Sequence, residues 1–129
     1  MKIDDFLYRK VIGQESKNFI KGHTLRPDLV LVNKKTKDKI VIDTKWKLGN
    51  QYISVQDLRQ VYTYGRYWNA KKVMLLYPGK TNNNKFEIFN NPNDSIVHQC
   101  KTGFVSVLNS KGNLDENLGI KIINLLELN

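Results

Sequence analysis

The sequence is short of several residue types, and each shortage excludes a class of protein. Cys100 is the single cysteine among 129 residues, so an internal disulfide is impossible and a reducing compartment is favoured. Cys100 also has no Cys or His partner at the spacing of metal ligands, which predicts a small buried side chain. No apolar run approaches the roughly 18 residues of a membrane span, and the Met1 end lacks the apolar core of a signal peptide. We therefore expect a soluble, cytoplasmic protein with no membrane contact.

Acidic residues are scarce in one part of the chain only. The whole chain has 21 Lys and Arg against 12 Asp and Glu, a net charge of +9. Residues 1–80 hold 17 basic and 7 acidic residues, whereas residues 81–129 hold 4 and 5. Such a polarised positive charge attracts a polyanion such as nucleic acid, although a net charge of this size also serves solubility. The length and the 40% apolar content favour one folded domain over residues 1–129.

Two short apolar runs, each with an acid at its outer end, predict the centre of the molecule. Leu29–Val32 follows Asp28, and Ile40–Ile42 precedes Asp43, with a lysine-rich turn between the runs. A hairpin that is symmetric about Lys35 and Thr36 places Asp28 opposite Asp43. Opposed residues on paired strands share a face, with their Cβ atoms about 4.5–5.5 Å apart. The two-residue period of a strand then places Lys45 on that face and Thr44 on the other.

The predicted pair of acids points to a metal site. Two carboxylates placed opposite each other repel, and this repulsion weakens a sheet unless a cation offsets it. Mg²⁺ prefers oxygen ligands and is commonly held by one or two carboxylates together with a substrate phosphate. The ammonium of Lys45 beside the pair could contact a phosphate oxygen or position a water. The alternative is that Asp28, Asp43 and Lys45 are solvated strand ends, as single acids usually are.

A helix and a further strand are predicted after the hairpin. Ser54 is a helix cap, and the apolar stripe that follows it predicts a helix to about Tyr67 or Asn69. Gln60 and Tyr64 are four residues apart, so they are neighbours on one face at the edge of this stripe. The buried run 73–77 predicts a strand parallel to residues 40–45, because a strand, a helix and a strand in this order form a right-handed crossover unit.

The remaining elements are predicted from periodicity. The spacing of Ile3, Phe6, Leu7 and Val11 predicts an N-terminal helix over 1–12. Short strands are expected at 86–89, 96–100 and 104–108, and a closing helix at 115–128. His23 is a weak candidate for a substrate contact, and His98 is expected to be structural. The expected fold class is α/β, with a mixed central sheet flanked by helices.

The ordered set of Pro27-Asp28, Asp43-Thr44-Lys45 and Gln60 with Tyr64 resembles the signature of the PD-(D/E)xK nuclease superfamily. It is similar to the branch that adds a Q-x-x-x-Y helix after the D-x-K strand. More narrowly, residues 25–28, 43–47 and 57–64 resemble the nuclease domains of the McrC type, which belong to McrBC 5-methylcytosine restriction systems. The resemblance covers about residues 14–80 and implies a restriction-endonuclease-like core.

The resemblance implies hydrolysis of DNA phosphodiester bonds that depends on Mg²⁺, with Mn²⁺ as a substitute. It implies Asp28, Asp43 and the backbone carbonyl of Thr44 as metal ligands. Lys45 would orient or help deprotonate the attacking water. The implied role of Gln60 and Tyr64 is to hold the site and the substrate from the helix. Further substrate contacts are expected from Lys47, Arg59 and Tyr64.

The chain also departs from the family pattern. Many relatives place a further metal-binding glutamate on the first helix, where this chain has Asp4 and Asp5, with Glu15 beyond Gly13. The preceding domain that engages a GTPase of the McrB type is expected to be absent, so this GTPase is an implied partner only. A homodimer is also conceivable, because paired cuts usually need two sites. Two other functions stay open: an inactive nucleic-acid-binding or scaffold module, and a nuclease for RNA or single strands.

Overall fold

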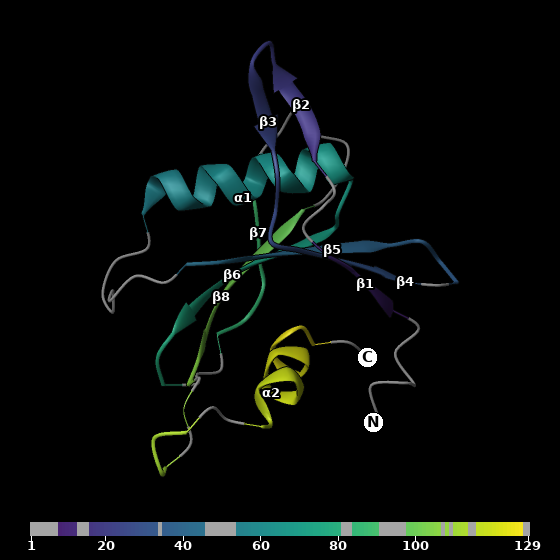
Figure 1. The fold of residues 1–129 in the computed structure, drawn as a ribbon. Coiled ribbons are helices and arrows are strands. Elements are labelled where there is room, and N and C mark those ends of the chain that lie inside the picture. The colour runs from purple at the N-terminus through teal and green to yellow at the C-terminus, as the bar shows by residue number, and fades with distance from the viewer. Residues whose placement is uncertain are drawn as a thin grey trace.

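A mixed sheet of six strands forms the centre of the molecule (Figure 1). The computed structural model describes residues 8–12, 16–33, 35–45, 54–80, 84–90, 98–106, 108, 110–113 and 116–127. The strands of the sheet lie in the order β1-β4-β5-β6-β8-β7. Their bounds are β1 Tyr8–Ile12, β4 Leu29–Asn33, β5 Lys39–Thr44, β6 Lys72–Pro78, β8 Gln99–Val105 and β7 Glu87–Ile88. A separate antiparallel pair consists of β2 Lys17–Ile20 and β3 His23–Leu25.

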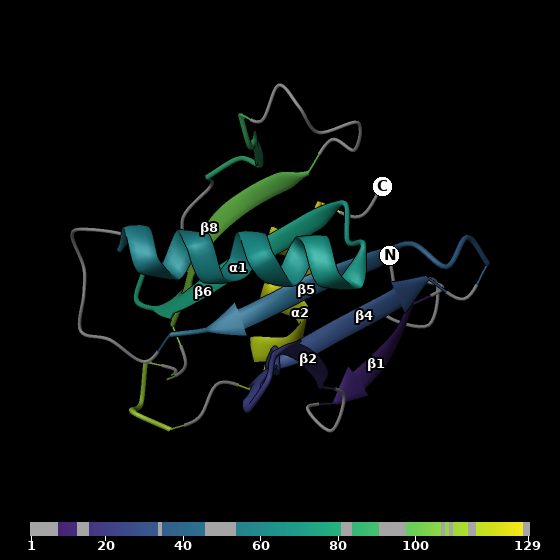
Figure 2. The same ribbon diagram turned by 90° about the horizontal axis from the view of Figure 1, so that it is seen from above.

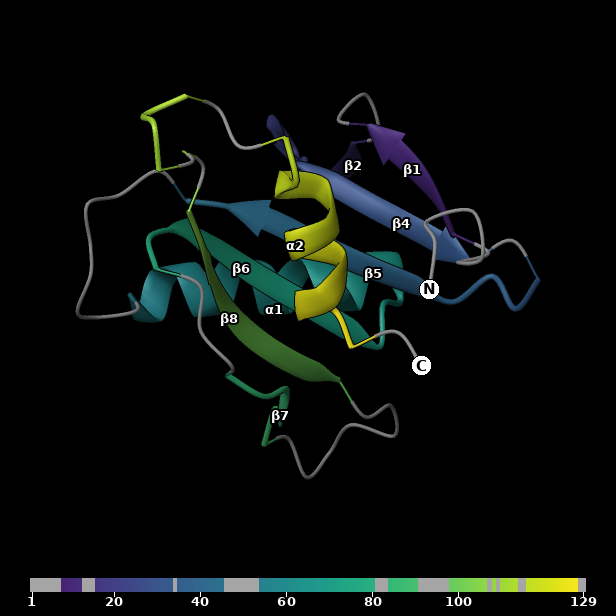
Figure 3. The same ribbon diagram turned by 90° about the horizontal axis from the view of Figure 1, so that it is seen from below.

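Two helices cover opposite faces of the sheet, α1 (Val55–Trp68) and α2 (Leu118–Leu125), as Figures 1 and 3 show. The alternation along β5 separates the two faces. Val41 packs in a cluster that includes Val61 and Trp68 of α1. Its neighbours Ile40 and Ile42 pack in a second cluster, which includes Leu125 of α2. The predicted α/β class, a restriction-endonuclease-like core with a mixed sheet flanked by helices, is confirmed.

The register of the central hairpin is the predicted one. β4 and β5 pair antiparallel, with Leu29 opposite Ile42 and Val32 opposite Lys39. These pairs have the symmetry about Lys35 and Thr36 that the sequence indicated. The turn is closed by the Asn33 side chain, whose oxygen accepts hydrogen bonds from the backbone N–H groups of Lys35 and Thr36 at 2.9 and 3.0 Å. Asp28 therefore immediately precedes β4, at the end of the hairpin where Asp43 lies near the end of β5.

The crossover from β5 through α1 to β6 is also confirmed. β5 and β6 are parallel, with Asp43 opposite Leu75. Ser54 caps α1 as predicted, since its hydroxyl accepts hydrogen bonds from the N–H groups of Gln56 and Asp57. The helix ends at Trp68, and the following residue, Asn69, caps it in a left-handed conformation. Figure 2 shows α1 lying across β5 and β6.

Gly65 allows α1 to approach the sheet closely. A Cβ atom at this position would lie 2.9 Å from Cγ1 of the buried Val73 on β6. We expect Gly65→Ala to lower the free energy of unfolding by about 1–3 kcal/mol, because the interior must shift to admit a methyl group. Thermal or urea unfolding measures this change. Gly119→Ala on α2 is the control: no atom lies within 4 Å of the added Cβ, so helix propensity alone should stabilise the protein by up to about 1 kcal/mol.

The N-terminal prediction was wrong in the part that the structure describes. Residues 8–12 were expected in a helix but form β1, which pairs antiparallel with β4. Without β1, the outer edge of β4 would present unpaired backbone N–H and C=O groups. Tyr8, Val11 and Ile12 also favour strands. The expected helical residues 1–7 lie outside the described part of the chain.

The C-terminal half contains one strand where two were expected. β8 runs without interruption over residues 99–105, whereas the sequence suggested a break between 100 and 104. Lys101 and Gly103 lie in this interval. Lys101 is buried, and its ammonium donates a 2.6 Å hydrogen bond to the Leu125 carbonyl of α2. Gly103 has no side chain and so leaves room for Leu125 of α2, whose Cδ1 would lie 3.2 Å from a Cβ added at position 103.

Smaller predictions agree with the structure in part. Within the expected strand 86–89, only Glu87–Ile88 is a strand, and the closing helix is confined to Leu118–Leu125 within the described residues. Residues 96–97 and 107 of the two expected strands are not described.

Cys100 is buried, and burial raises the pKa of its thiol to about 12, so its predicted packing role is confirmed. None of the helices among the described residues is long and apolar enough to cross a membrane.

Candidate functional site

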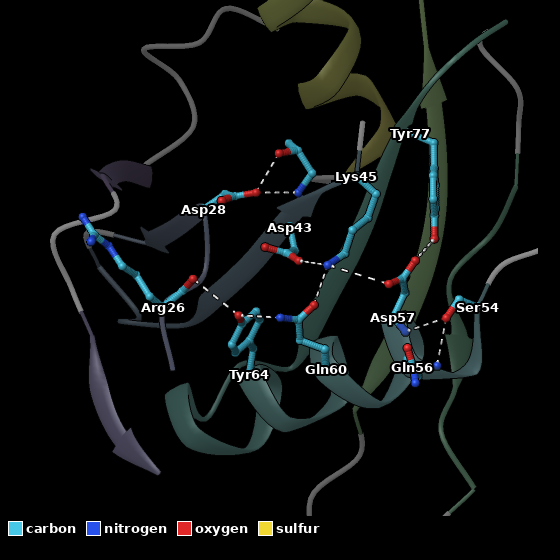
Figure 4. A network of polar contacts seen from close by, with 11 residues as sticks. Arg26, Asp28, Asp43, Lys45, Ser54, Gln56, Asp57, Gln60, Tyr64 and Tyr77 are labelled. Carbon is cyan, nitrogen blue, oxygen red and sulfur yellow. Dashed lines mark hydrogen bonds and ion pairs between the residues drawn. The ribbon is translucent and has the colours of Figure 1, made fainter. Parts of the chain in front are cut away.

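The two predicted acids meet at the carboxyl end of β5 (Figure 4). Asp43 is only 5% exposed, on the face of the sheet that α1 covers, and the register of β4 and β5 places Asp28, the residue before β4, beside it. Asp28 is held from β5: its Oδ2 accepts hydrogen bonds from the backbone N–H of Thr44 at 2.8 Å and from the Thr44 hydroxyl at 2.6 Å. The register of the hairpin and Figure 4 thus place Asp28 and Asp43 side by side, as predicted.

Lys45 lies beside the pair, as the strand period predicted. Its Nζ is 2.9 Å from Oδ2 of Asp43 and 3.8 Å from Oδ1 of Asp57. It also donates a hydrogen bond to Oε1 of Gln60. An ammonium has three donors, and here it faces three acceptors from β5 and α1. The position of Lys45 is therefore fixed from two elements of the fold.

Gln60 and Tyr64 connect this lysine to the start of β4. The Gln60 amide donates to the Tyr64 hydroxyl at 3.0 Å, and that hydroxyl donates to the Arg26 carbonyl at 3.4 Å. Tyr64 is 4% exposed and belongs to the core, whereas it was expected at the edge of the apolar stripe. Gln60 remains exposed. The predicted pair thus forms one chain of hydrogen bonds from Lys45 to the segment that carries Asp28.

Asp57 is a member of the site that was not predicted. Its carboxylate is buried, with the residue 7% exposed, and accepts a 3.1 Å hydrogen bond from the hydroxyl of Tyr77 on β6. From the sequence alone, Asp57 is an acid in the first turn of the predicted helix, where a negative charge is favourable without any partner. The helical spacing held a further signal, because Asp57 is four, seven and eleven residues before Val61, Tyr64 and Trp68, which are all buried. An acid on the buried stripe needs a partner, and Lys45 and Tyr77 supply it.

We expect Asp57→Asn to act on Lys45. The amide keeps the shape of the side chain and can still accept from Tyr77, but it removes one of the two negative charges beside the ammonium. If the site cleaves DNA, the rate should fall by about 10–100-fold, the usual cost of losing a supporting contact around a metal centre. Plasmid cleavage measures this. Asp38→Asn, in the connection between β4 and β5, is the matched control and should cleave at the rate of the unmodified protein.

The two acids ionise differently because their surroundings differ. Burial pushes the pKa of Asp28 up, but the hydrogen bonds from Thr44 outweigh it and hold the pKa below its usual value. Burial prevails at Asp43 and, with the charge of Asp28, raises its pKa despite the nearby ammonium. Burial lowers the pKa of Lys45, but the hydrogen bond and charge of Asp43 outweigh burial, and the pKa is raised. Lys45 is therefore a cation in this arrangement.

Not every predicted site residue joins the network. Arg59 is exposed on α1, and the contacts of the described residues do not link its guanidinium to Lys45 or the acids. Lys47, Asp4, Asp5 and Glu15 lie outside the described residues. His23 is exposed on β3, and His98 is buried with its Nδ1 2.7 Å from the Ala70 carbonyl, as expected of a structural histidine.

The chemistry of the donors fits a hard divalent cation. Asp28, Asp43 and Asp57 carry three negative charges in the network against the one positive charge of Lys45. Within the described part of the chain, no three His, Cys, Asp or Glu side chains gather closely enough to hold an ion by themselves. Mg²⁺ does not need such a set, because it keeps several waters and uses one or two carboxylates with substrate oxygens. Asp28 and Asp43, with the Thr44 carbonyl, would provide this smaller set.

Comparison with solved structures gives a likeness in fold. One match is described as a refined half-complex from the tetradecameric assembly of Thermococcus gammatolerans McrB AAA+ hexamers with bound McrC. The TM-score is 0.61 and the sequence identity is 21%. The match covers 93% of this chain but 28% of that chain, so the present chain corresponds to a minor part of the larger protein. A search among curated proteins finds no match.

A family model identifies the chain more closely. The model describes a McrBC 5-methylcytosine restriction system component and matches residues 6–78, which is more than half of the chain. The matched range contains the hairpin of β4 and β5, the crossover helix α1 and strand β6. It therefore includes Asp28, Asp43, Lys45 and the three contributing residues of α1. This chain belongs to the family of McrBC 5-methylcytosine restriction system components.

Proposed function

We propose that this chain is a metal-dependent DNA endonuclease domain of the McrC type. The observation that carries the proposal is the placement of Asp28 beside the buried Asp43, with the ammonium of Lys45 2.9 Å from the latter. Family membership supports a role in a restriction system. The net charge of +9, concentrated in residues 1–80, supports a polyanionic substrate.

The residues of the chain have distinct roles in this proposal. Asp28 and Asp43 would hold Mg²⁺, or Mn²⁺ in its place, together with the Thr44 carbonyl. A bound ion of this kind polarises a phosphoryl oxygen and lowers the pKa of a coordinated water. Lys45, held as an ammonium among three acceptors, would orient the attacking water and stabilise negative charge on the phosphate. This geometry favours orientation and charge stabilisation over removal of a proton by Lys45.

The helix side of the site would hold these groups in place. Gln60 fixes Lys45 and is itself fixed by the buried Tyr64. Its exposure leaves the amide accessible to a phosphate or a base edge. Arg59 and Lys47 are proposed to contact the DNA backbone outside this network. These two side chains would add affinity without sequence information, because phosphate contacts do not distinguish bases.

A GTPase subunit of the McrB type is the proposed partner. The structure that resembles this fold contains McrB hexamers with bound McrC. Recognition of methylated cytosine would then reside in the partner, and the present chain would supply the cutting site. Pairing of two copies would allow cleavage of both strands, and we propose a homodimer as the arrangement for such cuts.

Divalent-ion titration of the purified protein on plasmid DNA tests the proposal. We expect nicking that depends on Mg²⁺ or Mn²⁺, that EDTA abolishes, and that is absent from a variant with both Asp28→Ala and Asp43→Ala. Equal nicking by the two proteins would identify a contaminant and overturn the assignment. Absence of cleavage with retained, salt-dependent DNA binding would instead favour the inactive binding module. The same titration on RNA and single-stranded DNA determines the substrate class.

A further inference from the structure

The hairpin of β2 and β3 stands apart from the central sheet, on the same side as α1 (Figure 1). Its tip exposes two large apolar side chains: Phe19 is 51% and Ile20 63% exposed. Phe19 is an extra residue in the ladder, because the pairing shifts between Asn18 and Ile20, and such bulges redirect side chains. Gly22, with a φ of 82°, supplies the left-handed conformation that the tight turn requires.

This hairpin is fixed to α1 at its bulge and at its base. The Phe19 ring meets the Tyr67 ring edge to face, with 5.6 Å between centroids. The ammonium of Lys17 lies 5.1 Å from the centroid of the Trp68 ring. Just beyond the end of β3, the Arg26 carbonyl accepts the hydrogen bond from Tyr64. The hairpin is thus anchored on α1, the helix that also carries Gln60 and Asp57. These contacts hold the apolar tip in a fixed position relative to the site.

The charge around the tip indicates the kind of partner. Residues 16–26 contain Lys17, Lys21 and Arg26 and no Asp or Glu. Lysine is depleted at protein–protein interfaces, so a tip that combines apolar and lysine side chains fits such a partner poorly. Proteins that enter the minor groove of DNA combine basic residues with an apolar wedge between base steps. Lys21, exposed in the turn next to Ile20, gives this combination here.

The hairpin is also connected directly to the proposed cutting site. β3 ends at Leu25, and Arg26 and Pro27 lead to Asp28. From His23 to Asp28 the chain spans at most about 17 Å at the rise of an extended strand. This is about half a helical turn of B-DNA, in which one turn takes roughly 34 Å. A duplex with a phosphate at Asp28 and Asp43 would therefore have a groove within reach of the tip.

We propose that residues 19–23 form a wedge that enters the minor groove of duplex DNA beside the cleaved phosphate. Ile20 contacts and partly unstacks a base step, with Phe19 held beside it against Tyr67, while Lys21 contacts a flanking phosphate. The proposal rests on the proposed function in one respect, that the substrate is duplex DNA. It adds a second contact that holds the duplex and sets its direction across the site.

Binding of a short fluorescent duplex in EDTA tests the wedge without cleavage. We expect Ile20→Asp to weaken binding about tenfold or more, because it places a negative charge at the apolar tip. Lys21→Ala should remove one phosphate contact. The slope of the logarithm of the binding constant against the logarithm of the salt concentration should then become less steep by about one. Ile120→Asp on α2, also more than half exposed but on the opposite face of the sheet, is the control and should bind as the unmodified protein. Thermal unfolding checks that the variants fold.

A duplex containing 2-aminopurine gives a second measurement, because its fluorescence rises when the base is unstacked. We expect the rise with the unmodified protein and not with Ile20→Asp at a saturating concentration. Unchanged binding and fluorescence in Ile20→Asp would overturn the wedge, as would an equal loss on single-stranded DNA or no binding to duplex. A protein that loses binding through Ile20→Asp but never cleaves would retain the wedge and disprove the nuclease. Cleavage that is insensitive to Ile20→Asp would retain the nuclease and disprove the wedge.

Discussion

Asp43→Asn is expected to reduce metal-dependent cleavage by at least about a thousandfold, because it removes the buried charge that meets Asp28. Plasmid nicking under fixed Mg²⁺ measures this loss. The expected effect on stability has the opposite direction. Asp43 is 5% exposed and its pKa is raised by burial and by Asp28, so ionised Asp43 destabilises the fold. The neutral amide should therefore leave the thermal midpoint in EDTA unchanged or higher.

The response to Mg²⁺ separates a metal ligand from a structural acid. A ligand that binds only the folded state raises the thermal midpoint, so Mg²⁺ should stabilise the unmodified protein. The same addition should have no effect on Asp43→Asn. Asp38→Asn is the matched control: this acid lies just before β5, where its carboxylate pairs with the ammonium of Lys71 at 3.7 Å. An equal Mg²⁺ response in Asp43→Asn would show that Asp43 is not a ligand.

The site was predictable where local pattern determined the geometry. The two apolar runs and the turn between them fixed the register of β4 and β5, and with it the meeting of Asp28 and Asp43. The two-residue period then placed Lys45 on the same face. The i, i+4 spacing placed Gln60 next to Tyr64 in the same way. Each of these relations spans a few residues or one tight hairpin, so the sequence contains it directly.

The predictions were wrong where contacts between residues far apart in the sequence determine the local structure. Residues 8–12 could form a helix by apolar spacing, but the unpaired edge of β4 makes them a strand. The sequence predicted two strands with a gap between residues 100 and 104, but β8 is continuous there, and the buried Lys101 has its partner in a carbonyl of α2 more than twenty residues away. Asp57 looked like an ordinary acid of a first helical turn until Tyr77 of β6 and Lys45 at the end of β5 were placed beside it. These partners come from other elements, which local periodicity does not bring together.

Lys45→Met is expected to lower cleavage by about 10²–10⁴-fold while it preserves the response to Mg²⁺. The methionine fills a similar volume, but it removes the ammonium that contacts Asp43 at 2.9 Å and Asp57 at 3.8 Å. Losing a group that positions the water and stabilises charge has a cost of this order. The rate of plasmid nicking at saturating Mg²⁺ measures it, with Lys39→Met at the other end of β5 as the control.

The stability of Lys45→Met distinguishes a catalytic lysine from one that only balances charge. Without the ammonium, Asp43 and Asp57 are two buried acids without their shared cation, so the variant should unfold at a lower temperature in EDTA. Mg²⁺ should restore part of this loss, because the acids are then more available to a metal ion. If Lys45 only balanced the charge of Asp43, Mg²⁺ would restore cleavage as well as stability. Stability that recovers while cleavage stays low would assign Lys45 to the chemical step, since only that step needs an ammonium at the phosphate.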